Sequence, residues 1–378
     1  MYIYIGLSLF CLFCMVVENQ LGKRINRKIL TVILVLPLFV LSAFRAPSIG
    51  NDTYNYYKSF LMVSREQFFS VSQSRFEIGY IFYMRIVALF GIGYLGFQII
   101  TSAFILGSVS NFIYKYSNNI AFSFFIFITS RMYFGSMNLA RQYLAMAILL
   151  FSINSIKERK LIKFLLLVLL ATSMHFTAIF FLIVYPLSKF KFNNRTSLIL
   201  LSIGIVSAFM FDKLIIVFIN LTGRYAGYLN SVYFNFEDNI AIYLILIINL
   251  LFLLIAFITR YWRYGERKNK DSDSLDIVPS NYISSEKLWY EFCILTVIFS
   301  ILGLNATIIS RIEMYFSIFF LAYIPSVTGH IKSKRLRAIV ATGIILGLLV
   351  SFIVIMVYRP YWTSVFPYVW YWNSDLIN

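Results

Sequence analysis

The sequence has few charged residues, and acidic ones are scarcest. Of 378 residues, 13% are charged, with 16 Asp and Glu against 33 Lys and Arg. A soluble domain carries about twice that share of charge. A disordered chain lacks the high hydrophobic content found here, which is 60% of all residues. The composition therefore excludes both a soluble globular protein and a disordered one.

Several motifs of cofactor chemistry are also missing. The chain has no Walker A motif, no Cys/His cluster, no Gly-x-Ser-x-Gly and no Asp-x-Asp pair on a predicted outer loop. We therefore expect no cofactor and no metal, and no reaction driven by ATP or a nucleotide-sugar. Ion-coupled transport needs acids inside apolar runs, and only Asp212 and Glu313 come near this requirement. The three cysteines lie in apolar runs and are interpreted as packing residues.

Long apolar runs recur along nearly the whole chain, which is typical of a polytopic helical membrane protein. Five basic clusters lie between these runs, and the positive-inside rule places all five in the cytoplasm. This assignment requires that 161–187 form a hairpin turning outside at 172–175. It also requires that 78–92 be re-entrant or interfacial on the outer face. The runs cover residues 2–17, 29–44, 78–92, 94–114, 119–134, 137–155, 161–187, 196–218, 240–259, 288–308, 311–327 and 338–358.

The sequence thus predicts an all-α protein with about 12 transmembrane helices and one re-entrant or interfacial outer segment. We expect a single polytopic membrane domain, residues 1–378, with both termini outside. The polar cytoplasmic segment 263–287 is interpreted as a linker. The larger predicted outer segments are the loop 45–77, a turn around 131–141, the loop 219–239 and the aromatic tail 359–378.

Positive charge on the predicted outer side consists mainly of arginine. Nine Arg and two Lys lie there, whereas the inner side holds nine Arg and 13 Lys. Arginine binds phosphate through two parallel hydrogen bonds and stays charged. We interpret the outer set, most clearly Arg141 and Arg311, as binding an anionic ligand, most simply a lipid-linked phosphate. The alternative is pairing inside the protein or with lipid headgroups; Glu313 is a possible partner of Arg311, although residues two apart diverge on a helix.

Three groups are candidates for acid–base chemistry. Asp52 lies in a loop with Tyr54 and Tyr57, where a sugar could stack and be hydrogen-bonded, but it could equally cap a helix over 54–69. Glu77 is either an acid at a helix N-terminus or a carboxylate at an outer cavity. His175 lies at the predicted turn 172–175, where it could transfer protons, bind phosphate or simply pack.

The predicted outer tail is rich in aromatic residues. Eight of the 15 residues 358–372 are aromatic, among them Trp362, Tyr368 and Trp370. An aromatic belt at the membrane interface accounts for part of this number. Stacking against sugar faces is the additional role that we predict.

Short motifs ordered along residues 45–370 resemble the EpsG family, which belongs with the Wzy-type bacterial polysaccharide polymerases. The motifs are Arg45 with Asn-Asp-Thr-Tyr-x-x-Tyr at 51–57, Phe76-Glu77-Ile-Gly79-Tyr80, Arg141-Gln-Tyr-Leu-Ala145, Leu169 to Ala178 around His175, Arg311-Ile-Glu-Met-Tyr-Phe316 and the aromatic end around Pro367-Tyr368.

This resemblance implies a metal-independent, all-helical membrane glycosyltransferase, GT-C-like and related to O-antigen ligases, in the bacterial cytoplasmic membrane. It would join undecaprenyl-diphosphate-linked repeat units, its lipid-linked substrates, on the outer face. The implied partners are membrane lipids and a chain-length regulator and flippase of the same pathway, and not nucleic acid.

The resemblance also suggests residue roles. Arg141 and Arg311, with Arg131 and Arg45 as lesser candidates, would bind the diphosphates. A base would activate the acceptor hydroxyl, in the order of preference Asp52, His175, Glu77. Tyr54, Tyr57 and the tail would hold glycan. The alternatives are a flippase of lipid-linked oligosaccharide and an O-antigen-ligase-like transferase.

Overall fold

The computed structural model describes residues 1–190, 194–211, 213, 216–217, 220, 240–268, 284–306 and 309–374. Every regular element in these residues is helical, and Arg45 and Trp370 form an isolated antiparallel β-bridge. The predicted all-α class is therefore confirmed. Asp212, residues 219 and 221–239 of the predicted outer loop, and residues 269–283 of the predicted linker lie outside the described residues.

The chain divides into two compact units. The first comprises Met1–Ser155, Lys160–Ile179 and Ile344–Asn378, and the second comprises Ile156–Arg159 and Phe180–Gly343. The first unit therefore contains both ends of the chain, and the second is formed almost entirely by one continuous segment.

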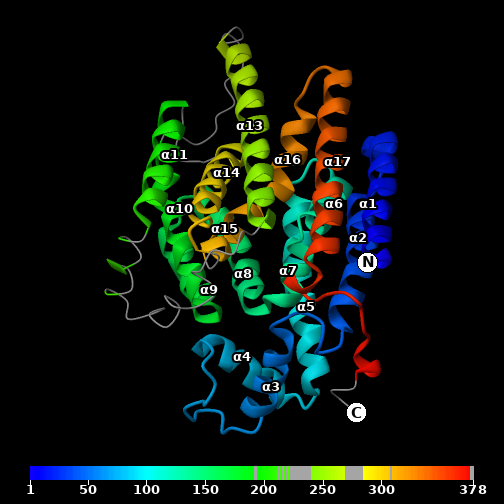
Figure 1. Ribbon diagram of the computed structural model, residues 1–378, viewed down its shortest axis with the longest axis vertical. Helices are drawn as coiled ribbons and strands as arrows, with labels where there is room; N and C mark the ends of the chain where they lie inside the picture. The colour runs from blue at the N-terminus through cyan, green and yellow to red at the C-terminus, as the bar shows by residue number, and fades with distance from the viewer. Residues whose placement is uncertain are drawn as a thin grey trace. The chain divides into compact units, whose positions relative to one another are not determined.

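The first unit contains most of the predicted outer segments. In Figure 1, α3 and α4 group together at one end of this unit, beyond α1, α2 and α6. Its helices are α1 (Tyr2–Leu21), α2 (Arg27–Ala43), α3 (Thr53–Val63), α4 (Ile78–Leu89), α5 (Gly93–Tyr116), α6 (Ile120–Thr129), α7 (Met132–Asn138), most of α8 (Ala140–Lys157), α9 (Leu161–Met174) and the end of α17 (Lys334–Tyr358).

The second unit is built around α14. This helix packs against α11, α13 and α15, and its aromatic residues Trp289 and Phe292 stack with Phe319 at ring-centroid distances of 5.4 and 3.9 Å. The helices of this unit are α10 (Val184–Leu187), α11 (Asn194–Phe209), α13 (Ile240–Lys268), α14 (Ser285–Leu302), α15 (Ser310–Ser317) and α16 (Phe320–Gly329).

Four described helices are long and apolar enough to cross a membrane. The number rises to six if each of two bent helix pairs counts as one span. The four are Tyr2–Leu21, Gly93–Tyr116, Ile242–Thr259 and Lys334–Tyr358. The bent pairs are α6 with α7, at 58°, and α15 with α16, at 49°. These helices support a membrane protein, and the predicted number of 12 crossings is not confirmed.

The predicted outer turn around 131–141 is wrong. Residues Met132–Asn138 form α7, and all seven are buried. The chain instead bends at Ser130 and Arg131, where Arg131 takes a left-handed φ of 65° that ends α6 and allows α7 to begin at a new angle.

Two other predicted elements differ in length from the observed ones. The helix expected over 54–69 runs from Thr53 to Val63, with Asp52 at its N-cap position but without a capping hydrogen bond from the side chain. The α4 helix has 12 residues, or about 18 Å, which is too short for a hydrocarbon core of about 30 Å. Its length agrees with the prediction that 78–92 does not cross.

The tail returns to the first unit and docks on the segment that follows α2. Ala46 N donates to Val369 O at 2.9 Å, and Tyr371 N donates to Phe44 O at 2.8 Å, on either side of the Arg45–Trp370 bridge. These bonds fix the tail against the beginning of the predicted outer loop 45–77.

Candidate functional site

Glu77 is the centre of an ionic cluster in the first unit. It lies at the N-cap position of α4, and one carboxylate oxygen accepts a short hydrogen bond from Arg141 Nη1. The other oxygen accepts from Phe176 N at 3.1 Å and lies 3.3 Å from His175 Nδ1. The structure thus brings together three residues that lie far apart in sequence and that were each predicted as site residues.

A close approach of α4 to α9 places Glu77 beside His175. A Cβ atom at Gly79 would lie 2.7 Å from Ser173 Cβ and 2.8 Å from Ser173 O, so glycine is required for the two helices to come this near. Gly79 follows Glu77 by two residues, and Ser173 precedes His175 by two. The α9 helix ends at Met174, and His175 has extended backbone angles, so the chain leaves the helix at His175.

Arg141 enters the cluster from the first turn of α8. Its guanidinium lies 4.1 Å from the centroid of the Phe76 ring and 5.9 Å from those of Tyr56 and Tyr80. These aromatic faces attract the cation and shield it from water. The side chains of Arg141 and Glu77 are each 19% exposed, so the ion pair is largely buried.

The surroundings of Glu77 keep it ionised. Glu77 lies outside the candidate membrane-spanning helices. Burial by itself would raise the pKa of its carboxyl, but the hydrogen bond from His175 and the charges of Arg141 and His175 lower that pKa to about 2. A carboxylate facing His175 Nδ1 fixes the orientation of the imidazole, so that Nε2 points away from Glu77. The cluster can therefore supply a fixed cation and an oriented imidazole at one place.

Asp52 is held in place through its backbone. Asp52 N donates to Asn138 Oδ1 at 3.0 Å, which ties the start of α3 to the end of α7. Its side chain is half-buried. Tyr56, four residues further along the chain, lies with its ring centroid 5.9 Å from the Arg141 guanidinium.

Arg131 belongs to a second cluster of the same unit, formed with the tail. Its guanidinium stacks 3.9 Å from the centroid of Trp362. Asn51 Nδ2 donates to Trp362 O at 2.9 Å, and Ser364 Oγ donates a short bond to Asn51 Oδ1. Arg131 and Ser364 both have left-handed backbone angles, with φ of 65° and 47°. Strain of this kind is found where surrounding structure holds a residue for a specific contact.

Arg45 is placed inside the protein. It is 3% exposed, and its guanidinium donates to the carbonyls of Ser42 and of Met137, the latter at 2.9 Å. Gln98 Nε2 in turn donates to Arg45 O at 2.8 Å. These contacts join α2, α5 and α7, which favours a structural contribution for Arg45 over direct contact with a ligand.

The other predicted glycan-binding aromatics pack among themselves. Tyr54 and Tyr57 stack with centroids 6.2 Å apart, and both are half-buried. Trp370 stacks on Trp372 at 5.2 Å and meets Tyr368 edge-on at 5.0 Å. Each of these five rings keeps part of its surface exposed.

Arg311 lies in the second unit, in the first turn of α15, where it is half-buried. Glu313, which was considered as its partner, is buried and accepts a hydrogen bond from Asn249 Nδ2 of α13 at 3.1 Å. Asn249 also donates to Ser300 of α14 at 2.8 Å. Glu313 thus joins three helices of its unit.

Sequence reasoning missed the residues that surround and position the charged groups. These are Phe76 and Tyr56 against Arg141, Gly79 at the helix contact, and Asn138 at the start of α3. Phe76 and Gly79 belong to the segment that resembled a family motif, and that was the available signal. Among the residues that the structure describes, no group of three or more His, Cys, Asp or Glu side chains is arranged to hold a metal ion.

The fold and this cluster define an all-helical membrane protein with a largely buried arginine–carboxylate–histidine site. The family model of the EpsG family matches residues 28–370, and the chain belongs to this family. Membership supports, at the family level, a polymerase of polysaccharide biosynthesis. No curated protein and no solved structure matches the chain.

Proposed function

We propose that this protein is a polysaccharide polymerase that joins undecaprenyl-diphosphate-linked oligosaccharide units on the outer face of the bacterial cytoplasmic membrane. It transfers the glycan from its lipid diphosphate to a hydroxyl of a second lipid-linked unit, without metal or nucleotide. Family membership supports the class of reaction. The observation that carries the mechanism is the contact of Glu77 with both Arg141 and His175.

The proposed reaction is a single displacement at the anomeric carbon. His175 Nε2 accepts the proton of the acceptor hydroxyl, whose oxygen forms the new bond to that carbon. The bond from the carbon to the phosphate oxygen breaks, and its electron pair leaves with the lipid diphosphate. Glu77 stabilises the imidazolium that forms, as a carboxylate does for a catalytic histidine.

Arg141 has the role of stabilising the departing diphosphate. Its guanidinium is held against the Phe76 ring, so it does not have to move as negative charge develops on the phosphate. A bidentate guanidinium fits two phosphate oxygens better than a lysine ammonium does. The contact between Glu77 and His175 favours His175 as the base, so His175 moves ahead of Asp52, which was preferred from the sequence.

The Arg131–Trp362 cluster is proposed to hold glycan. A half-buried tryptophan with a cation on its ring, next to an asparagine, offers a stacking surface and a hydrogen-bonding amide to a sugar. Arg311 is proposed separately as a phosphate-binding residue of the second unit, because of its position at the start of α15.

The test is incubation of the purified protein in lipid vesicles with lipid-linked repeat units alone. We expect polymer to form without ATP and in the presence of a chelator. Variants His175→Asn and Glu77→Gln should reduce the initial rate by about 10²-fold or more. An unchanged rate in both variants would refute the assigned base, and absence of polymer with the wild-type protein would instead favour the flippase.

A further inference from the structure

The loop 64–77 connects α3 to α4 and ends with Phe76 and Glu77, two residues of the ionic cluster. It has 14 residues and no helix or strand of its own. None of its side chains is buried, and Phe69 and Val71 at its tip are 87% and 96% exposed. Its aromatic contacts with α3 and α4 are those of Phe68 with Phe82 and of Phe76 with Tyr56 and Tyr80. Between these two points, the course of the loop depends on its polar contacts.

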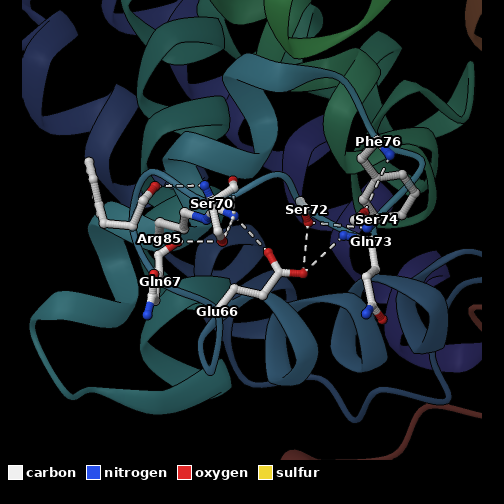
Figure 2. Close-up of polar contacts among 9 residues, drawn as sticks. Glu66, Gln67, Ser70, Ser72, Gln73, Ser74, Phe76 and Arg85 are labelled. Carbon is white, nitrogen blue, oxygen red and sulfur yellow. Dashed lines mark hydrogen bonds and ion pairs between the residues drawn. The ribbon is translucent and has the colours of Figure 1, made fainter.

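Arg85 of α4 supplies the anchor of these contacts. It is 4% exposed, and its guanidinium donates to Phe68 O at 2.6 Å and to Ser70 O at 3.0 Å. It also forms an ion pair with Glu66 Oε2 at 2.7 Å. Figure 2 shows Arg85 on one side of Glu66 and the second half of the loop on the other. One buried cation therefore fixes three points of the first half of the loop.

The carboxylate of Glu66 continues the network toward the ionic cluster. Its Oε1 accepts from Ser72 Oγ at 3.0 Å and from Gln73 N at 3.1 Å. Ser74 N donates to Ser72 Oγ at 3.1 Å, and Phe76 N donates to Ser74 Oγ at 3.3 Å. An unbroken path of hydrogen bonds thus leads from Arg85 to Phe76, as seen in Figure 2.

We propose that Arg85 and Glu66 are positioning residues, which set the loop 64–77 so that Phe76 lies under Arg141 and Glu77 reaches His175. Hydrogen bonds from a guanidinium to a carboxylate and to two carbonyls fix direction as well as distance, because the donors are planar. Without this anchor, the cluster still contains the same side chains, but Glu77 is displaced from His175. The catalytic part of this inference rests on the proposed function.

The experiment uses the full-length protein in lipid with Arg85→Met, Glu66→Gln and the double variant. Arg75→Met, which removes an exposed arginine of the same loop, is the matched control. The direct readout is hydrogen exchange of the Phe176 amide, which donates to Glu77 Oε1 at 3.1 Å but lies 91 residues from Arg85. We expect exchange there and in residues 72–77 to become about tenfold faster in each variant.

The kinetic readout separates positioning from a purely structural contribution. With lipid-linked units as substrate, we expect kcat per folded protein to fall about tenfold while KM changes little, since the binding groups remain. Because the two residues act through one ion pair, the double variant should be no worse than Arg85→Met. Glu66→Gln retains the shape of the side chain and serves if Arg85→Met does not fold.

Three results would overturn the proposal. The first is faster exchange in residues 72–77 with no change at Phe176, and the second is an equal increase in α8, which would indicate general destabilisation. The third is an unchanged kcat despite faster exchange at Phe176. If the wild-type protein makes no polymer, the proposed function fails, whereas exchange at Phe176 still decides whether Arg85 positions Glu77.

Discussion

Replacing Gly79 by alanine tests how closely α4 and α9 must approach for Glu77 to contact His175. The added Cβ would clash with Ser173 Oγ and would lie 2.7 Å from the Cβ and 2.8 Å from the carbonyl oxygen of the same residue. The hydroxyl can rotate away, but Cβ and the carbonyl move only with the helix. Because carbon atoms pack at about 3.5–4 Å, the two helices must separate by about 1 Å.

This displacement acts on the site because the contact lies two residues from both Glu77 and His175. A misplacement of about 1 Å between reacting groups lowers rates by about 10²-fold. We expect a loss of that size in the initial rate of polymer formation by Gly79→Ala. Overpacking of this kind also lowers stability by about 1–3 kcal/mol, which is measured as a lower thermal midpoint.

The matched control is Gly107→Ala in α5, where an added Cβ meets no atom within 4 Å. This change should leave the rate unaltered and the thermal midpoint unchanged or higher, because alanine favours a helix over glycine by about 1 kcal/mol. The second-site change Ser173→Gly removes two of the three clashes and should restore part of the rate of Gly79→Ala. Equal rates for wild type, Gly79→Ala and Gly107→Ala would refute the argument that this helix contact positions the site.

Three further predictions concern single residues. Arg141→Ala should lower the initial rate by about 10²–10³-fold, and Arg141→Lys should recover only a part, since a point charge replaces a bidentate donor; a full recovery with lysine would contradict the diphosphate role. Because the pKa of Glu77 is lowered on folding from 4.5 to about 2, its stabilising contribution is complete above about pH 4.5 and is lost as the pH falls toward 2. The thermal midpoint of wild type should therefore fall toward that of Glu77→Gln across this window, and a constant difference would show that the ion pair does not stabilise the fold. Arg131→Gly should shorten the polymer while leaving the thermal midpoint nearly unchanged, because relief of about 1–2 kcal/mol of left-handed strain offsets the lost cation–π contact of about 0.5–1 kcal/mol; polymer of normal length would count against a glycan contact at Trp362.

Apolar runs predicted helices reliably where one run forms one straight helix. The runs 94–114 and 338–358 correspond to α5 (Gly93–Tyr116) and to α17 (Lys334–Tyr358). Continuous hydrophobicity does not reveal a bend, however, because residues on both sides of the bend are equally buried. The bend between α6 and α7 lies inside the run 119–134, and the bend between α15 and α16 lies inside the run 311–327. The number of crossings could therefore not be predicted from the runs.

The site residues were predictable individually but not as a cluster. Arg141, Glu77 and His175 each stand out as a charged or titratable residue near an apolar helix. The contact between Glu77 and His175 depends on Gly79, because the missing side chain lets α4 approach α9 closely. The residue pattern of one helix does not indicate which other helix packs against it. The polar loop around Asp52 favours it as the base when the sequence alone is considered. In the structure its backbone N–H bonds to Asn138, and its carboxylate makes no capping hydrogen bond to α3.

The ion pair between Glu77 and Arg141 is compatible with an anion site at Arg141. A buried arginine without a counter-ion is costly, so a carboxylate must accompany it while no substrate is bound. A diphosphate carries more negative charge and offers oxygens to both arms of the guanidinium fork, so it can take the place of the carboxylate. Glu77 then keeps its contact with His175 but loses the neutralising charge of Arg141. The freed carboxylate then interacts with His175 without competition from Arg141, and it stabilises the imidazolium that forms in the proposed reaction. In the proposed reaction, binding of the lipid diphosphate therefore prepares the cluster for catalysis. His175 takes the proton of the acceptor hydroxyl, and the oxygen of that hydroxyl attacks the anomeric carbon.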